Sequence, residues 1–223
     1  MNFFEINENT QDALANAPIP TGINENVDFV SAVMEPLKEG GDPVLQYNFT
    51  DSEGRELSHK MWEPDPQRIK ENAEAYPKEH SRNVPAMGFV KGEPVTPEQA
   101  VIIAGQEFQA YNKHILKRIV DEKALVEKMK GVSDYADFGN RVVELTKEAG
   151  LPVKVRLKVV LDYNEKYHVL PKKHYEPFIE PMTVPKENSS LKITQYDKVK
   201  LTTAESADNP DDFNAGMFEQ PGF

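Results

Sequence analysis

The chain has 223 residues, and its 37 acidic and 26 basic side chains give a formal net charge of -11. This balance argues against a simple nucleic-acid-binding domain, because such domains usually carry a basic footprint. The absence of cysteine excludes disulfides, zinc ribbons and thiol catalysis.

The first part of the chain predicts strands. Residues 22–37 are largely apolar in both phases, whereas residues 43–50 and 55–63 alternate on either side of a turn that ends at Gly54. Alternation around a short turn predicts a β-hairpin. Tyr47 and Phe49 fall in the apolar phase, so we expect them in the core rather than on a binding surface.

The middle of the chain predicts helices. A proline-rich connection over residues 64–95 has room for a short helix around 68–75. Thr96, Pro97 and Gln99 then form a capping-box pattern, which predicts a helix to about residue 129 with a break near Val120. A second helix is expected over residues 134–149.

Strands return after Gly150. Residues 151–163 alternate between aliphatic and cationic side chains, and residues 167–182 read as a partner strand broken by prolines. Residues 190–201 alternate again, as an edge strand or an extension. The order predicts an α+β fold: a five-stranded OB-fold-like barrel with a large helical insertion between the third and fourth strands.

The expected organisation has three parts. Residues 1–21 form a flexible acidic N-terminal arm, residues 22–202 the OB-fold-like domain with its helical insert at about 96–150, and residues 203–223 a disordered acidic C-terminal tail. Residues 1–20 hold three acids and residues 203–223 hold five, with no base in either segment. Residues 154–200 hold ten bases and six acids, so the negative charge hides a basic C-terminal half.

Catalytic patterns are lacking. No glycine-rich phosphate loop follows a strand, and the five histidines show no metal-ligand spacing. We therefore expect no enzyme activity, no metal and no cofactor. No 18-residue apolar run and no signal-peptide pattern occur, so we expect a chain without a membrane span, in the cytoplasm.

Binding of a single strand needs cations for phosphates and aromatic rings for bases. The alternation places Lys154, Arg156 and Lys158 in a row on a strand face that we expect to point outward, and it places Lys60 and Trp62 on the polar phase of the third strand. Further candidates follow in the last hairpin: Tyr163, Tyr167, Lys172, Lys173 and Tyr175. The alternatives are a merely solvated cationic face and a cross-hairpin pair for Tyr167.

Together these features resemble the single-stranded DNA-binding proteins of bacteriophages that have an OB-fold. The likeness rests on the strand order with its insert, on the segment VKVRLKVVLDYNEKYHVLPKKHYEPFIEP (153–181), and on an acidic tail that ends in Phe223. It implies a protein that coats single-stranded DNA during phage replication or recombination in the host cytoplasm. The cations above would contact phosphates and Trp62 and the tyrosines would stack on bases.

The same resemblance implies that the tail competes with DNA and recruits replication proteins. Apolar residues spaced among acids fit short anchors for a partner, or the tail is a plain solubilising segment. The candidate partner-binding residues are Asp211, Asp212, Phe213, Phe218 and Phe223. The alternative function is a phage structural or adaptor protein that acts through protein contacts.

Overall fold

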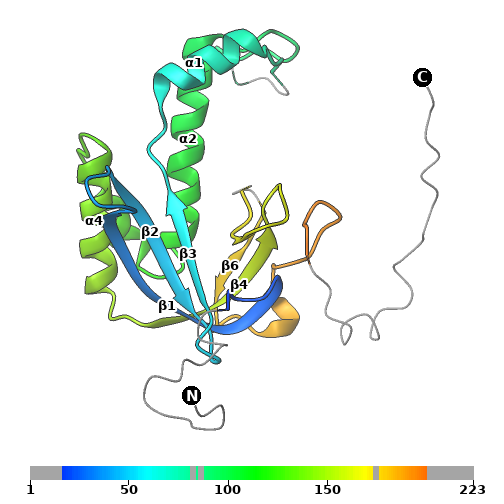
Figure 1. Cartoon of the computed structure of the whole chain (residues 1–223). Helices are drawn as coiled ribbons and strands as arrows, with labels where there is room; N and C mark the ends of the chain where they lie inside the picture. Colours follow the sequence, from blue (N-terminus) through cyan, green and yellow to red (C-terminus); the bar gives the residue numbers. More distant parts are fainter. Residues whose placement is uncertain (1–16, 81–83, 85–87, 173–175, 200–223) are drawn as a thin grey trace, which may run out of the picture.

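The computed structural model describes residues 17–80, 84, 88–172 and 176–199. Within these ranges the protein is a mixed α+β structure with one six-stranded antiparallel sheet (Figure 1). The strands are β1 (Gly22–Pro36), β2 (Pro43–Thr50), β3 (Glu56–Met61), β4 (Val153–Leu161), β5 (His168–Val169) and β6 (Ile179–Pro181).

The sheet is open. Its strands follow the order β3-β2-β1-β4-β5, and β6 pairs with β4 on the same side as β5. Of the OB-fold-like barrel expected from the sequence, the α+β class and the helical insertion are confirmed. In the described part of the chain, however, β3 and β5 are the ends of this order, so the strands do not close into a barrel. The physical reason is the shortness of β5, whose two residues are soon followed by Pro171, a residue that cannot donate to a strand ladder.

All the described α-helices lie between β3 and β4, as the sequence predicts. They are α1 (Pro66–Ala75), α2 (Pro97–Leu116), α3 (Glu122–Lys128) and α4 (Tyr135–Glu148). The capping box at Thr96 is confirmed: its hydroxyl accepts from the Gln99 backbone, and the Gln99 side chain accepts from the Thr96 backbone. The predicted break near Val120 is also present, because α2 ends at Leu116 and Asp121 caps α3.

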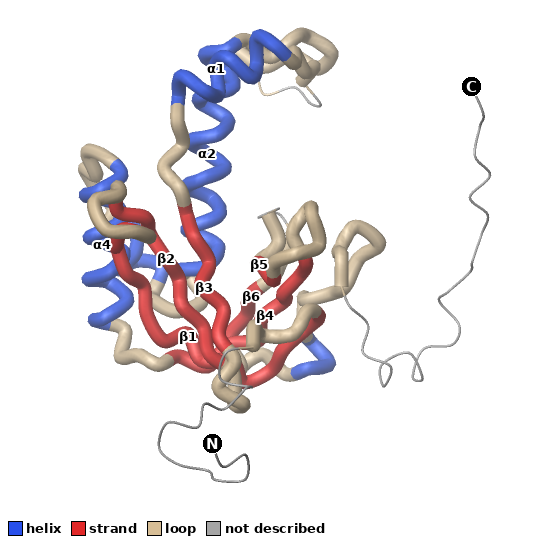
Figure 2. The backbone as a smooth tube through the Cα atoms, viewed as in Figure 1, coloured by secondary structure: helices blue, strands red, loops and turns tan. Residues whose placement is uncertain are grey.

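The two halves of α2 have different surroundings. Its last turns are buried in the core through Tyr111, Ile115 and Leu116. Its first half and α1 pack on each other and stand away from the sheet, as Figure 2 shows. We call α1, the first half of α2 and the loop between them the helical projection.

Tyr111, near the end of α2, packs between β3 and the segments around β5 and β6. The Tyr111 ring stacks on His59 of β3, with 5.3 Å between centroids, and on Phe178, which precedes β6, at 5.0 Å. Its hydroxyl donates to the Pro171 carbonyl at 3.0 Å. Tyr111 therefore connects β3 with the chain around β5 and β6, and burial raises the pKa of its hydroxyl.

The core lies between the inner face of the sheet and the helices. Phe29, Tyr47 and Phe49 are buried and their rings pack together, which confirms the prediction that Tyr47 and Phe49 are core residues. The Tyr47 hydroxyl donates to Asn112 Oδ1 at 2.6 Å, so its buried polar atom has a partner on α2.

Two boundaries differ from the sequence expectation. Ile19 is fully buried and its backbone bonds to Glu56, so the packed part begins before residue 22. Residues 190–199 form no strand; together with Ser189 they run as an irregular segment across β4. We call residues 189–199 the strap.

Candidate nucleic-acid interface

The three cations of β4 do not form an exposed row. Lys154 is exposed and pairs with Asp28 at 2.9 Å, but the side chains of Arg156 and Lys158 are only 3% and 1% exposed. The expectation of an outward cationic face is therefore wrong for Arg156 and Lys158. The cause is that the strap crosses this face of β4, and that both the strap and β6, which lies beside β4 in the sheet, supply acids to it.

Arg156 is neutralised within the sheet. Its guanidinium donates to the Glu180 carboxylate, and its Nε lies 3.7 Å from Glu25 Oε1. Burial alone would raise the pKa of Glu180, but hydrogen bonds from Ser189, Arg156 and Ser190 hold it below its ordinary value. Arg156 is thus committed to a buried ion pair and cannot reach a phosphate in this arrangement.

Lys158 fastens the strap. Its ammonium donates to Asp197 Oδ2 at 2.9 Å and to the Lys192 carbonyl at 3.1 Å, and Glu176 lies 3.6 Å away. The Asp197 carboxylate also accepts the backbone N–H of Thr194 at 2.8 Å. A buried charge needs such partners, because its desolvation is costly.

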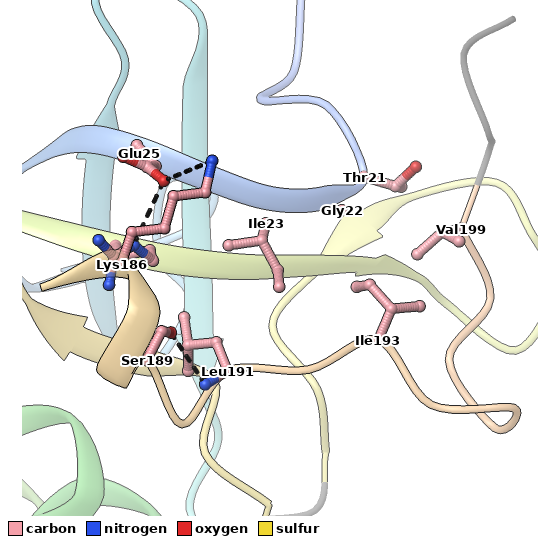
Figure 3. A pocket seen from close by; sticks show the side chains of 10 residues that line it. Thr21, Gly22, Ile23, Glu25, Lys186, Ser189, Leu191, Ile193 and Val199 are labelled. Carbon is pink, nitrogen blue, oxygen red and sulfur yellow. Dashed lines mark hydrogen bonds and ion pairs between the residues drawn. The ribbon is translucent and has the colours of Figure 1, made fainter. Parts of the chain in front are cut away.

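Beside Arg156 the strap and the start of β1 enclose a cavity of about 330 Å³. Figure 3 shows Ile23, Leu191 and Ile193 within it, and Glu25 facing Lys186 at 3.4 Å. Glu25 lies within ion-pair distance of both Arg156 and Lys186. Because carboxylates meet both cations, this cavity does not offer a positive site for an anion.

The outer face of β2 and β3 keeps its predicted cation and aromatic ring exposed. Lys60 is exposed and Trp62, directly after β3, is 60% exposed. Lys60 pairs in register with Gln46, next to the pair of Asn48 and Ser58. Polar side chains surround the lysine, and within the described residues no carboxylate forms an ion pair with it.

The β4–β5 turn exposes two further candidates, Tyr163 at 83% and Tyr167 at 68%. The Asp162 carboxylate accepts the backbone N–H groups of Lys166 at 2.7 Å and Tyr167 at 3.0 Å, which fixes the turn. These bonds, that from Tyr167 foremost, lower the pKa of Asp162. Lys172 is also exposed, close enough to Asp162 to favour its charged form.

Several predicted residues lie outside the described part of the chain. These are Lys173 and Tyr175 of the hairpin and Asp211, Asp212, Phe213, Phe218 and Phe223 of the tail. Their roles stay predictions.

Sequence reasoning missed two residues of the strap. Tyr196 is 72% exposed, and Lys198 lies beside the β4–β5 turn, with its ammonium 5.2 Å from the centroid of Tyr163. Lys198 also pairs with Glu165 at 3.0 Å. The sequence does place Tyr196 and Lys198 on either side of Asp197. A segment interpreted as an edge strand, however, does not indicate which turn of the protein it contacts.

Among the ranges that the structure describes, no three histidine, aspartate or glutamate side chains are grouped so as to hold a metal ion. Within the same ranges, none of the helices combines the length and apolar character that crossing a membrane requires. The chain matches no protein-family model, no curated protein and no solved structure.

Proposed function

We propose that this protein binds single-stranded DNA without catalysing a reaction, using exposed aromatic rings and lysines on an OB-like sheet. The observation that carries the proposal is the exposure of Trp62, Tyr163 and Tyr167 together with Lys60 and Lys172. Large rings usually bury much of their surface, so three rings at 60–83% exposure beside cations favour a ligand with flat faces and negative charge.

The strand arrangement supports an OB-like reading of the open sheet. β1 lies between β2 and β4, and β5 follows at the far side of β4. OB-folds bind oligonucleotides through strands 2 and 3 and through the loop between strands 4 and 5. Trp62 and Lys60 belong to the first of these regions, and Tyr163 and Tyr167 belong to the second.

The lysines and rings have separate tasks in this proposal. Lys60 and Lys172 neutralise phosphates, which makes affinity depend on salt but not on sequence. Trp62 and the turn tyrosines stack on bases, at about 1–3 kcal/mol for each base. By the resemblance set out above, the DNA is the exposed single strand of phage replication or recombination.

Trp62 provides a direct test because it is the only tryptophan. We expect oligo-dT to quench its emission at about 50 mM salt and to bind more weakly at about 200 mM, where phosphate contacts are screened. A labelled oligonucleotide, followed by anisotropy, should bind Trp62→Leu about 5- to 100-fold more weakly. Tyr76→Leu is the matched control, since Tyr76 is 73% exposed but lies on the helical projection.

The proposal fails if the unaltered protein neither loses Trp62 emission nor raises the anisotropy of the oligonucleotide at about 50 mM salt. Equal losses in Trp62→Leu and Tyr76→Leu would also contradict it, because they would show that any exposed ring matters equally.

A structural or adaptor role is the second candidate, and the helical projection favours it. Tyr76 and Ala100 line a mostly apolar groove of about 650 Å³ between α1 and α2, and Ile102 nearby is 49% exposed. Exposed apolar surface of this kind is typical of protein contacts. This role predicts no affinity for oligo-dT, so the fluorescence titration separates the two functions.

A further inference from the structure

A second pocket, distinct from the cavity beside Arg156, lies where the strap meets the β4–β5 turn. Its volume is about 330 Å³, and its lining combines apolar Val169, Leu170 and Pro171 with Tyr163 and Tyr196. We propose that this pocket holds one unpaired nucleotide of the single strand, with the base against the tyrosines and the phosphate beside Lys172 and Lys198. The inference rests on the proposed function and adds a subsite formed by the strap.

The size and lining suit a nucleotide. Pockets for small molecules span about 300–1,000 Å³, so this one is at the lower end and fits one base with its sugar. The apolar lining residues favour binding of a desolvated nucleobase, and tyrosine rings can stack on the flat face of that base. Tyr163 and Tyr196 are 83% and 72% exposed, so most of their surface meets solvent.

Positive charge lies at the same place. Lys172 and Lys198 both line the pocket, and the Lys198 ammonium is 5.2 Å from the Tyr163 ring centroid. The three acids of the lining are already engaged: Asp162 accepts backbone N–H groups of the turn, Asp197 pairs with Lys158, and Glu176 lies 3.6 Å from the Lys158 ammonium. A phosphate would compete with Glu165 and with the Tyr163 carbonyl for the Lys198 ammonium, and the exposed ion pair with Glu165 is weak.

The strap residues are fixed before any ligand arrives. The Leu161 backbone N–H donates to the Lys198 carbonyl at 2.7 Å, and the Lys198 ammonium donates to the Tyr163 carbonyl at 3.1 Å. Between Tyr196 and Lys198, the buried Asp197 is tied to Lys158 at 2.9 Å. This anchoring lowers the ordering cost of binding, because the backbone that carries both side chains is already placed.

Photocrosslinking and affinity test the pocket together. Oligo-dT with 5-iodouracil substitutions is irradiated with the full chain, and the crosslinked residues are mapped by mass spectrometry. We expect crosslinks at Tyr163 or Tyr196. By anisotropy at about 50 mM salt, Tyr196→Leu should bind oligo-dT about 5- to 100-fold more weakly, whereas the control Tyr76→Leu stays within about twofold.

The lysines have their own control. Lys172→Gln should reduce the slope of log affinity against log salt by about 0.7, the value for one phosphate contact with a single strand. Lys186→Gln, whose side chain is 82% exposed beside the other cavity, should leave that slope unchanged. A competition experiment with thymidine monophosphate tests whether the pocket is specific for a strand rather than for a free nucleotide. Thymidine monophosphate should not displace the labelled oligonucleotide at concentrations at which unlabelled oligo-dT displaces it.

Failure of the inference differs from failure of the proposed function. If the protein binds oligo-dT but Tyr196→Leu binds equally well and crosslinks occur only at other residues, the pocket is not a subsite and single-strand binding stands. If thymidine monophosphate displaces the strand equally well, the site is one for free nucleotides and the inference is overturned. If the unaltered protein does not bind oligo-dT, both proposals fall.

Discussion

His59 lies on β3 against the ring of Tyr111, and burial lowers its pKa to about 4. A histidine in an unfolded chain has a pKa of about 6.5. Between these values the unfolded chain takes up a proton that the folded protein does not. His59 therefore favours folding above pH 6.5, and this contribution is lost as the pH falls from about 6.5 to 4.

We predict that stability falls by about 2 kcal/mol between pH 7.5 and pH 5 because of this one residue. The comparison is His59→Phe, which keeps an aromatic ring on Tyr111 but does not titrate. Urea unfolding of both proteins at the two pH values measures the effect. An equal pH dependence in the variant would show that other groups cause the fall.

At the scale of elements, a buried ion pair is one of the contacts that fasten the strap to β4. Asp197 and Lys158 have side chains 8% and 1% exposed, whereas the nearby pair of Lys198 and Glu165 is open to solvent at 45% and 61%. Removing one partner of a buried pair leaves an uncompensated charge, but removing one partner of an exposed pair costs little.

We predict that Asp197→Ala lowers the free energy of unfolding by about 3 kcal/mol, and that the control Glu165→Ala lowers it by less than about 1 kcal/mol. Urea denaturation gives both values. Replacing both partners, as in Lys158→Met with Asp197→Leu, should restore much of the loss, since no charge is then buried alone. Similar small effects for Asp197→Ala and Glu165→Ala would contradict this role of the pair.

Patterns along the chain predicted most elements but not which faces are covered. The capping box at Thr96 and the alternation around Gly54 are local, so the α2 start and the β2–β3 hairpin could be predicted. The alternation of β4 showed correctly that Arg156 and Lys158 share a face. It could not show that Glu180 and Asp197 would meet them, because these acids lie more than 20 residues away in segments without a clear period.

The candidate site was predictable to a similar degree. Trp62, in the polar phase of its strand, and the tyrosines of the β4–β5 turn are exposed because the ends of hairpins and turns face solvent. Their exposure could therefore be predicted from the local sequence pattern. Tyr196 and Lys198 join Tyr163 only through the path of the strap, which is set by the buried Asp197 and by the backbone bond from Leu161. Long-range packing of that kind leaves no period in the sequence.

At the scale of the whole molecule, most of the excess negative charge lies in the two terminal segments of the chain. Removing residues 203–223 takes away five acids and no base, so the formal charge changes from -11 to -6. Like charge repels a phosphate chain, and salt screens this repulsion over about 10 Å at 0.1 M.

We therefore predict that the protein without residues 203–223 binds oligo-dT several-fold more tightly at about 50 mM salt, and that the difference shrinks at about 200 mM. A full-length variant with the five acids changed to amides is the control, and it should bind as tightly as the truncated protein. Anisotropy measures all three proteins. If truncation tightens binding but the amide variant does not, charge is not the cause.

The strap also determines where those acids are tethered. Its last two described residues lie at the two pockets: Lys198 lines the pocket at the β4–β5 turn, and Val199 lines the cavity beside Arg156. The sequence predicts a disordered tail, and a disordered chain of about 24 residues would have a root-mean-square span of roughly 25 Å, which gives a tethered group an effective concentration in the millimolar range. Because a tethered acidic tail stays with its own molecule, its competition with DNA would not depend on the protein concentration. A separate acidic peptide would have to reach millimolar concentration to compete with DNA as strongly.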